Sequence, residues 1–549
     1  MATTQHAVVS DRQVGMTDQE KLVIFASSLG TVFEWYDFYI YGTLGVFLAK
    51  YFFSNVPANV GFIFTLLAFA AGFAVRPLGA LVFGRIGDIV GRKYTFLVTM
   101  TLMGLGTFFI GVLPSYAQWG ILAPIVLIGL RLVQGLALGG EYGGAAIYVA
   151  EHAPADKRGY YTSWIQTTAT LGLFMALLLI LAIRTIMGDA AFAEWGWRVP
   201  FLLSIVLLGV SIWIRLKLSE SPVFQRMKEE GRASKRPLSE AFGQWSNAKI
   251  ALFALLGATA GEAVVWYGGQ FYALFFLTQT LKVEATTAQI MIAVALAIGT
   301  PFFIVFGWLS DKVGRKPIML LGFALAVITY APNSPFNIFK GITHYANPAL
   351  EKALASAPVV VVADPAECSF QFKMTGTEKF TTSCDTAKAA LVAASVNYRN
   401  EPAPKGTPAV VKVGEESIAT QSADFAKLLS AAIAKHGYPA KADPAQINTT
   451  MTVLLLTILV IYVTMVYGPI AAWLVELFPT RIRYSGVSLP YHIGNGWFGG
   501  FLPATVFAIV AATGDIYSGL WYPVAVAAMS FVVGLLFLPE TKDVDITRM

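Results

Sequence analysis

Charged side chains are scarce in this chain: they make up 13% of its 549 residues, whereas hydrophobic residues make up 56%. A soluble protein has about 25% charged residues, so the shortage excludes an ordinary soluble domain. The apolar residues form long blocks, among them IFTLLAFAAGFAV, ILAPIVLIGL and MTVLLLTILVIYV, each continuous with further apolar sequence. A run of about 20 apolar residues can cross a bilayer as a helix. The composition therefore predicts a polytopic, all-α membrane protein.

Several motifs that carry chemistry are absent from the sequence. There is no GxxxxGK[ST] loop to cradle phosphates, which argues against coupling to ATP. The two cysteines and five histidines show no metal-ligand spacing, so we expect no metal and no cofactor. No nucleophile elbow or kinase motif set occurs either, so we do not expect an enzyme. Work done at a membrane would then draw on an ion gradient.

The positions of the charges argue against nucleic-acid binding. The formal net charge is +6, but the Lys and Arg residues fall in short loops between apolar blocks. Cationic loops on one side are what membrane orientation predicts. The first apolar block is too long and too acidic for the core of a signal peptide, so we expect it to remain as the first span.

Twelve apolar blocks are predicted to span the membrane. They lie near residues 22–48, 59–83, 94–114, 121–149, 161–184, 199–217, 249–280, 286–308, 317–338, 450–475, 485–511 and 518–538. With a cytoplasmic N-terminus, the loops rich in Lys and Arg all face the cytoplasm. We therefore expect a multi-pass protein of a bacterial inner membrane with both termini in the cytoplasm.

The chain repeats itself. GRIGDIVGRK (84–93) follows the second span and GWLSDKVGRK (307–316) follows the eighth. EHAPADKRG and SESPVF in the first half have weaker counterparts in ELFPTRIRYSG and LPETKD in the second. Two similar sets of six spans are typical of secondary transporters. The predicted parts are a first bundle at 1–218, a cytoplasmic loop at 219–248, and a second bundle at 249–339 and 450–549.

An additional polar segment, residues 340–449, interrupts the second half. It mixes strand-like runs (APVVVVAD, CSFQFKM, PAVVKVG) with a helix-like one (SADFAKLLSAAIAKHG), which predicts a small α/β insertion on the periplasmic side. Both cysteines, Cys368 and Cys384, lie in it. An oxidising compartment suits a disulfide between them, and the alternative is two free buried thiols. The location of the cysteines agrees with the side predicted from the charged loops.

Five motifs resemble the major facilitator superfamily, and within it the metabolite:proton symporter family. They are EWYDFYIYG in the first span, RPLGALVFGRIGDIVGRK through the second, RLVQGLALGGEYGGA in the fourth, GWRVPFLLS opening the sixth, and SESPVF. The resemblance covers the chain except for the insertion. This family includes carriers for α-ketoglutarate and other organic acids, shikimate, and proline or betaine. The resemblance implies two six-helix bundles around a central cavity that opens alternately to each side.

The paired loops contain the predicted gating residues. Asp88 can accept hydrogen bonds, glycines allow helices to approach closely, and Arg92 stays in the wetter interface. Such a cluster can hold the spans in one conformation and release them in another. An orientation signal with a helix cap is the alternative, but the acid recurs at Asp311. The predicted gating residues are Gly84, Asp88, Gly91, Arg92, Asp311, Gly314, Arg315, Glu476 and Arg481.

The stretch GTVFEWYDFYIYG, residues 30–42, places Glu34 and Asp37 at bilayer depth, where each charge costs at least about 2.5 kcal/mol. Three residues apart, the two acids share a helix face and can point towards Arg131 or Arg76. Burial favours the neutral acid and a nearby arginine favours the ionised one, so a balanced acid could carry a proton. A permanent ion pair is the alternative, and the two roles are compatible. Glu34, Asp37 and Arg131 are the predicted proton-coupling residues.

Polar and aromatic residues in both halves predict a cavity for a small molecule. The predicted substrate-binding residues are Arg76, Tyr36, Gln134, Glu262, Tyr267, Gln270, Tyr467 and Asn495. Arg76 and Arg131 favour an organic acid, with a proline- or betaine-like osmolyte as the alternative. We therefore predict a monomeric secondary transporter for proton-coupled uptake of a small polar metabolite. The other hypotheses are a receptor that uses the insertion as its ligand-binding head and, less favoured by the resemblance, a proton antiporter.

Overall fold

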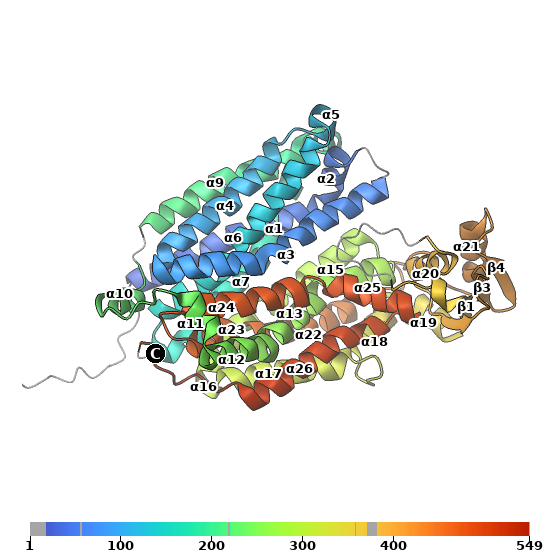
Figure 1. Cartoon of the computed structure of the whole chain (residues 1–549). Coiled ribbons are helices and arrows are strands. Elements are labelled where there is room, and N and C mark those ends of the chain that lie inside the picture. Colours follow the sequence, from blue (N-terminus) through green and yellow to red (C-terminus); the bar gives the residue numbers. More distant parts are fainter. Residues whose placement is uncertain (1–17, 55–57, 218–219, 357, 371–380, 548–549) are drawn as a thin grey trace, which may run out of the picture.

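The computed structural model describes residues 18–54, 58–217, 220–356, 358–370 and 381–547. Two groups of helices, one from each half of the chain, run side by side (Figure 1). The groups approach each other at the end where α10 (Pro222–Glu229), α11 (Pro237–Gly243) and the C-terminus lie, which we call the charged end (Figure 1). They separate towards the opposite end, the sheet end, where a small β-sheet lies beside the second group (Figure 1).

The first group packs around α6. Its main helices are α1 (Asp18–Thr43), α2 (Gly45–Phe52), α3 (Ala58–Ile89), α4 (Arg92–Val112), α6 (Leu122–His152), α7 (Arg158–Met187) and α9 (Val199–Leu216). Glycines set the approach of α6 to α3: a Cβ at Gly135 or Gly139 would lie 2.2 Å from the carbonyl oxygens of Gly72 and Arg76. Any larger residue there would therefore push the two helices apart.

The second group has the same order of helices with more irregular turns. Its main elements are α12 (Trp245–Ala254), α13 (Ala260–Tyr267), α14 (Ala273–Phe275), α15 (Ala285–Gly299), α16 (Pro301–Val313), α17 (Arg315–Tyr330), α22 (Thr449–Tyr467), α23 (Ile470–Leu477), α24 (Arg483–Ile493), α25 (Leu502–Thr513) and α26 (Trp521–Phe537). Four π-helical turns interrupt it: η3 (Leu255–Thr259), η4 (Gly268–Tyr272), η5 (Phe276–Thr280) and η7 (Gly494–Gly499). Such turns are frequent at functional sites.

Nine helical stretches of the described chain are long and apolar enough to cross a membrane. They are Arg92–Val112, Leu122–His152, Ala155–Met187, Gly196–Leu216, Trp245–Thr280, Ala285–Val313, Thr449–Leu477, Arg483–Thr513 and Ser518–Phe537. The other three predicted spans fall on α1, α3 and the 16-residue α17. The count of twelve spans therefore stays a prediction.

The inserted segment carries the sheet. Its elements are α18 (Ile338–Ala346), α19 (Pro348–Ser356), β1 (Val359–Ala363), α20 (Ser383–Ala393), β2 (Arg399–Pro402), β3 (Val410–Val413), β4 (Glu416–Ala419) and α21 (Phe425–Lys435). The strand order is β2-β1-β3-β4, with β1 parallel to β2 and antiparallel to β3. Alternate residues of β1 are buried, as its period of two predicts. The run CSFQFKM falls mostly outside the described residues.

Candidate functional site

The first contact between the halves at the charged end centres on Asp88, at the end of α3. Its fully buried carboxylate accepts hydrogen bonds from the amides of Tyr484 (3.0 Å) and Ser485 (2.9 Å), in the first turn of α24. The Ser485 hydroxyl donates a third bond at 2.8 Å. Arg92 pairs with Asp88 at 3.1 Å and donates to the carbonyl of Thr480 at 2.7 Å. An acid of the first half thus caps a helix of the second half.

The second contact repeats the first with the halves exchanged. Asp311, near the end of α16, accepts hydrogen bonds from the amides of Gly159 and Tyr160, both at 2.8 Å, in the first turn of α7. Arg315 pairs with Asp311 at 2.6 Å, in the same i, i+4 relation that joins Arg92 to Asp88. The internal repeat of the sequence is therefore a structural repeat across the interface.

Two further ion pairs cross the interface beneath these caps. Glu151, at the end of α6, pairs with Arg483 of α24 at 2.7 Å. Glu476, at the end of α23, pairs with Arg158 of α7 at 2.7 Å and with Arg315 at 3.1 Å. All of these side chains are at most 3% exposed. Because buried charges need partners, the four crossing contacts form a unit that depends on the two halves being in contact.

Glycine is required at the start of both α4 and α17. Gly91 has φ +144° and Gly314 has φ +111°, which other residues rarely adopt. The amides that follow are capped by acids from the ends of the halves: Glu220 accepts from Lys93 at 3.2 Å, and Glu540 accepts from Lys316 at 3.0 Å. Gly84 lets α3 approach α24, since a Cβ there would lie 3.0 Å from the Cα of Ser485.

One predicted gating residue lies apart from this unit. Arg481 is 44% exposed and pairs with Glu240 of α11, whereas Arg483 occupies the buried position. Glu151 and Arg158 were not among the predicted gating residues, although both belong to the unit. The signal that points to them is the weaker repeat, because EHAPADKRG and ELFPTRIRYSG align Glu151 with Glu476.

Aromatic rings from both halves meet in the middle of the molecule. Trp35 of α1 lies 5.8 Å from Trp266 of α13, measured between ring centroids. Tyr142 of α6 stacks on Tyr491 of α24 at 3.7 Å and on Tyr467 of α22 at 6.2 Å. The structure thus places Tyr467 in this layer, and it adds Trp35, Trp266, Tyr142 and Tyr491, which were not predicted as site residues.

The predicted polar residues of the middle layer separate into two groups. In the second half, Asn495 donates to Glu262 at 2.9 Å, and the other carboxylate oxygen of Glu262 has no hydrogen-bond partner among the described residues. In the first half, Arg131 donates to Gln134 at 2.6 Å, and Gln134 donates to Thr107 at 2.8 Å. Each group is therefore held within its own half.

The remaining predicted residues line or support this layer. Arg76 is buried, with its guanidinium 4.3 Å above the ring of Phe73, and a π-turn buries Gln270. Tyr267 packs edge-on against Phe73 at 6.1 Å, whereas the hydroxyl of Tyr36 donates to the carbonyl of Pro200 in α9 at 2.7 Å.

The predicted proton-coupling residues lie on α1 and α6, which contact each other. Asp37 and Arg131 are both buried, and the guanidinium of Arg131 lies 4.1 Å from the centroid of the Tyr41 ring. The side chain of Glu34 lies outside the described residues. His492, a turn before Asn495, is also buried, and neither ring nitrogen has a hydrogen-bond partner in the described chain. A buried imidazole without partners is a polar group available to water or a ligand.

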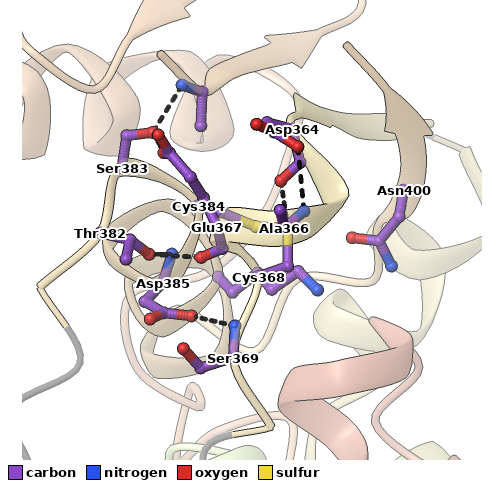
Figure 2. The surroundings of a disulfide bond; sticks show 12 residues. Asp364, Ala366, Glu367, Cys368, Ser369, Thr382, Ser383, Cys384, Asp385 and Asn400 are labelled. Carbon is purple, nitrogen blue, oxygen red and sulfur yellow. Dashed lines mark hydrogen bonds between the residues drawn. A yellow bond between two sulfur atoms is a disulfide. The ribbon is translucent and has the colours of Figure 1, made fainter. Parts of the chain in front are cut away.

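A disulfide joins Cys368 to Cys384 in the inserted segment, with an S–S distance of 2.03 Å (Figure 2). It connects the segment after β1 to the first turn of α20. Hydrogen bonds support both ends: Ser369 donates to Asp385 at 2.9 Å, and Ser383 donates to Glu367 at 2.7 Å (Figure 2). Nearby, two backbone amides bond to Asp364 and hold the pKa of its carboxyl below the usual range.

Replacing both Cys368 and Cys384 by Ser should destabilise the inserted segment by about 3 kcal/mol, because closing the 16-residue loop removes disorder from the unfolded chain. Limited proteolysis of the purified protein, with and without reductant, measures this effect. We expect faster cleavage within 340–449 in the double variant and in the reduced wild type, but not in the helical bundles. Equal cleavage rates would show that the disulfide is not needed for stability.

The aromatic layer shared by the two halves and the duplicated contacts at the charged end are features of a membrane carrier. Comparison with known proteins agrees with this class. The profile of the sugar (and other) transporter family matches residues 22–253 and 421–549. The chain belongs to this family, which is part of the major facilitator superfamily. The relatives of the chain are transporters and not enzymes. A Haemophilus influenzae protein described only as a metabolite transport protein is 31% identical over 538 residues, 97% of each chain.

Relatives with more specific names match part of the chain. The proline/betaine transporter of Salmonella typhimurium is 36% identical over 327 residues, which are 57% of this chain and 65% of the relative. The chain thus spans slightly less than two thirds of that transporter. The α-ketoglutarate permease of Escherichia coli is 36% identical over 330 residues, 60% of this chain and 75% of the permease.

Solved structures of low sequence identity share the fold. The proton:xylose symporter XylE bound to 6-bromo-6-deoxy-D-glucose aligns with a TM-score of 0.61 and 14% identity, over 96% of this chain and 98% of that one. FucP in the outward conformation aligns with a TM-score of 0.54 and 12% identity, over 95% and 100% of the two chains. The chain therefore has the helical fold of the major facilitator superfamily.

Proposed function

We propose that this protein carries a small polar metabolite, together with protons, across a bacterial inner membrane by alternating access. The observation that supports this most is the doubled set of contacts at the charged end. Two caps and two ion pairs hold the halves together there, and each of the four joins one half to the other, so all of them break when the halves separate. A receptor that only anchors the inserted segment has no need for such a unit.

The charged end faces the cytoplasm in this proposal, and the inserted segment lies in the periplasm. Among the short loops between helices, those at the charged end carry most of the Lys and Arg residues, as the bias of membrane orientation requires. The disulfide at the sheet end suits an oxidising compartment. In this orientation the structure corresponds to a carrier whose cytoplasmic gate is closed.

We favour an organic acid as the substrate, since Arg76 and Arg131 are buried cations in the first half. The alternative is a zwitterionic osmolyte of the proline or betaine type. It is favoured by the aromatic layer around Trp35 and Trp266 and by the carboxylate of Glu262, because aromatic faces and acids attract an ammonium group. The α-ketoglutarate and proline/betaine relatives correspond to these two alternatives.

Uptake into proteoliposomes with an imposed pH gradient tests the function. A panel of small organic acids and zwitterions is added outside, with the pH difference set in either direction. Accumulation of a substrate only when the outside is acidic supports proton symport. Accumulation in the opposite gradient would indicate an antiporter, and no flux of any compound would favour the receptor.

We further propose that the inserted segment caps the periplasmic side as a brace within the second half. Two hydrogen bonds join this segment to the chain that follows α25. The amide of Tyr398 donates to the carbonyl of Gly514 at 2.8 Å, and the side chain of Asn397 accepts from the amide of Ile516 at 3.0 Å. On the other side, Ser395 donates to the carbonyl of Gln279 in η5 at 3.3 Å. Residues 395–398 therefore connect the end of α25 to η5, both of which belong to the second half.

Replacing Asn397 by Ala should loosen this connection, because its hydrogen bond to the amide of Ile516 is partly buried and a typical hydrogen bond contributes about 0.5–1.5 kcal/mol. Hydrogen exchange, followed by mass spectrometry, should speed up about two- to tenfold at residues 511–517 and in α20. Ser417→Ala, on the exposed face of β4, is the matched control and should change neither. Unchanged transport after deletion of 345–445 would contradict a role for the brace in the transport cycle.

A further inference from the structure

A small polar cavity lies at the charged end, beside the crossing ion pairs. Its volume is about 120 Å³. Its polar walls carry three arginines, two threonines and one glutamate: Arg226, Glu230, Arg232, Thr480, Arg481 and Thr547. The walls come from the segment that connects the halves, from the loop before α24, and from the C-terminal segment. No predicted function of the chain accounts for a cavity with this lining.

The arginines of the cavity are only partly neutralised. Arg232 pairs with Glu230, and Arg481 pairs with Glu240, yet both arginines remain about half exposed, at 49% and 44%. Arg226 has no acidic partner in the described part of the chain. Three arginines and one glutamate give the lining a net charge of +2. The cavity therefore favours an anion.

The cavity is coupled to the closed charged end through Thr480. The carbonyl of Thr480 accepts a hydrogen bond from Arg92 at 2.7 Å, and its hydroxyl donates to the carbonyl of Ile546 at 3.2 Å. Arg92 also lies 4.6 Å above the ring of Phe224, on the helix that carries Arg226. The contacts that close the charged end thus also bring the walls of the cavity together.

We propose that this cavity binds a phosphate-bearing anion and that the bound anion stabilises the closed charged end. The guanidinium groups of the three arginines match the oxygens of phosphate, to which they can donate paired hydrogen bonds. The cavity has room for a group the size of a few water molecules, each about 30 Å³. A soluble phosphate and the headgroup of an anionic phospholipid offer the same chemistry.

The expected effect follows from mass action. An anion that binds only when the walls are together favours the closed state by the factor 1 + [L]/Kd. At about ten times its Kd, it should raise the ratio of closed to open molecules about tenfold. This shift is measured by binding and by accessibility, so it does not depend on which metabolite is transported.

Two measurements test the proposal. Inorganic phosphate is titrated onto the detergent-purified protein at constant ionic strength, while thermal unfolding is followed. In parallel, the protein is placed in nanodiscs of phosphatidylglycerol or of phosphatidylcholine. A cysteine introduced at the buried Ser488 of α24, labelled with a water-soluble maleimide, reports opening of the charged end. Both measurements are repeated with two variants. Arg226→Gln removes an arginine of the cavity, and Arg236→Gln, the control, removes an exposed arginine of the same connecting segment.

Each outcome distinguishes a source or rejects the site. A saturable rise of the unfolding temperature with phosphate, weakened about tenfold in Arg226→Gln but not in Arg236→Gln, supports a soluble phosphate. Slower labelling in phosphatidylglycerol than in phosphatidylcholine, again lost only in Arg226→Gln, supports a lipid headgroup. Absence of both effects, or an equal response of the two variants, overturns the proposal.

Discussion

Replacing Glu476 by Gln should open the charged end. In the wild type this carboxylate neutralises Arg158 across the interface at 2.7 Å and Arg315 at 3.1 Å, with all three side chains almost fully buried. The variant leaves the buried guanidinium of Arg158 without its acid, whereas Arg315 keeps its pair with Asp311, and breaking a buried ion pair costs about 3–5 kcal/mol. A loss of that size shifts a two-state equilibrium by about two to three and a half powers of ten.

Maleimide labelling of a cysteine at position 488 measures this shift. We expect the labelling rate of Glu476→Gln to rise about 100-fold, because the cysteine is shielded only while the halves are in contact. Asp189→Asn is the matched control. It breaks the ion pair between Arg184 and Asp189, whose side chains are 50% and 80% exposed, respectively. Exposed pairs contribute at most about 1 kcal/mol, so the control should label like the wild type.

A double variant separates an uncompensated charge from a lost contact. If the free Arg158 guanidinium drives the opening, Glu476→Gln combined with Arg158→Gln should recover part of the closed state, since removing both partners is less costly than removing one. A labelling rate equal to that of the wild type in the single variant would show that these pairs do not hold the charged end closed.

The sequence predicted which residues lie together at the charged end where two of its features coincided, whereas their role in gating stays a prediction. GRIGDIVGRK and GWLSDKVGRK repeat an acid, a glycine and an arginine at fixed spacing, and the structure puts Asp88 and Asp311 at equivalent caps. The hydrogen-bond donors to these acids could not be predicted. They are backbone amides, and which amides are free to donate depends on where α7 and α24 begin. The choice of Arg483 over Arg481 could not be predicted either, because the two stand two residues apart where α24 begins and only packing buries one of them.

The middle layer was less predictable for a different reason. Single aromatic residues in apolar helices have no periodicity that separates lining from packing, so Tyr142 and Tyr491 could not be distinguished from core residues. Their stacking across the interface depends on how the two halves approach each other. Tyr36 shows the opposite case: it belongs to the acidic stretch of the first span, yet its hydroxyl is committed to the backbone of α9.

Replacing Asp37 by Asn should abolish accumulation driven by the pH gradient. Asp37 is buried on α1, two residues after Trp35, whose ring contacts Trp266 of the other half. A neutral amide of the same shape cannot take up and release a proton, so substrate movement would no longer be linked to the gradient. For one proton per substrate, two pH units correspond to about 2.7 kcal/mol, or about 100-fold accumulation. The variant should reach an internal-to-external ratio of about one.

Exchange measured without a pH gradient distinguishes lost coupling from lost transport. Labelled substrate inside and unlabelled substrate outside should still exchange in Asp37→Asn, because exchange needs alternating access but no net proton movement. Glu34→Gln is the matched variant for the second acid, one turn before Asp37. Asp189→Asn is again the control at an exposed site. If Asp37→Asn and Glu34→Gln both concentrate substrate as the wild type does, these acids have a structural role and the proton travels elsewhere. The buried carboxylate of Glu262, bonded on one side to Asn495, would then be the next candidate to neutralise.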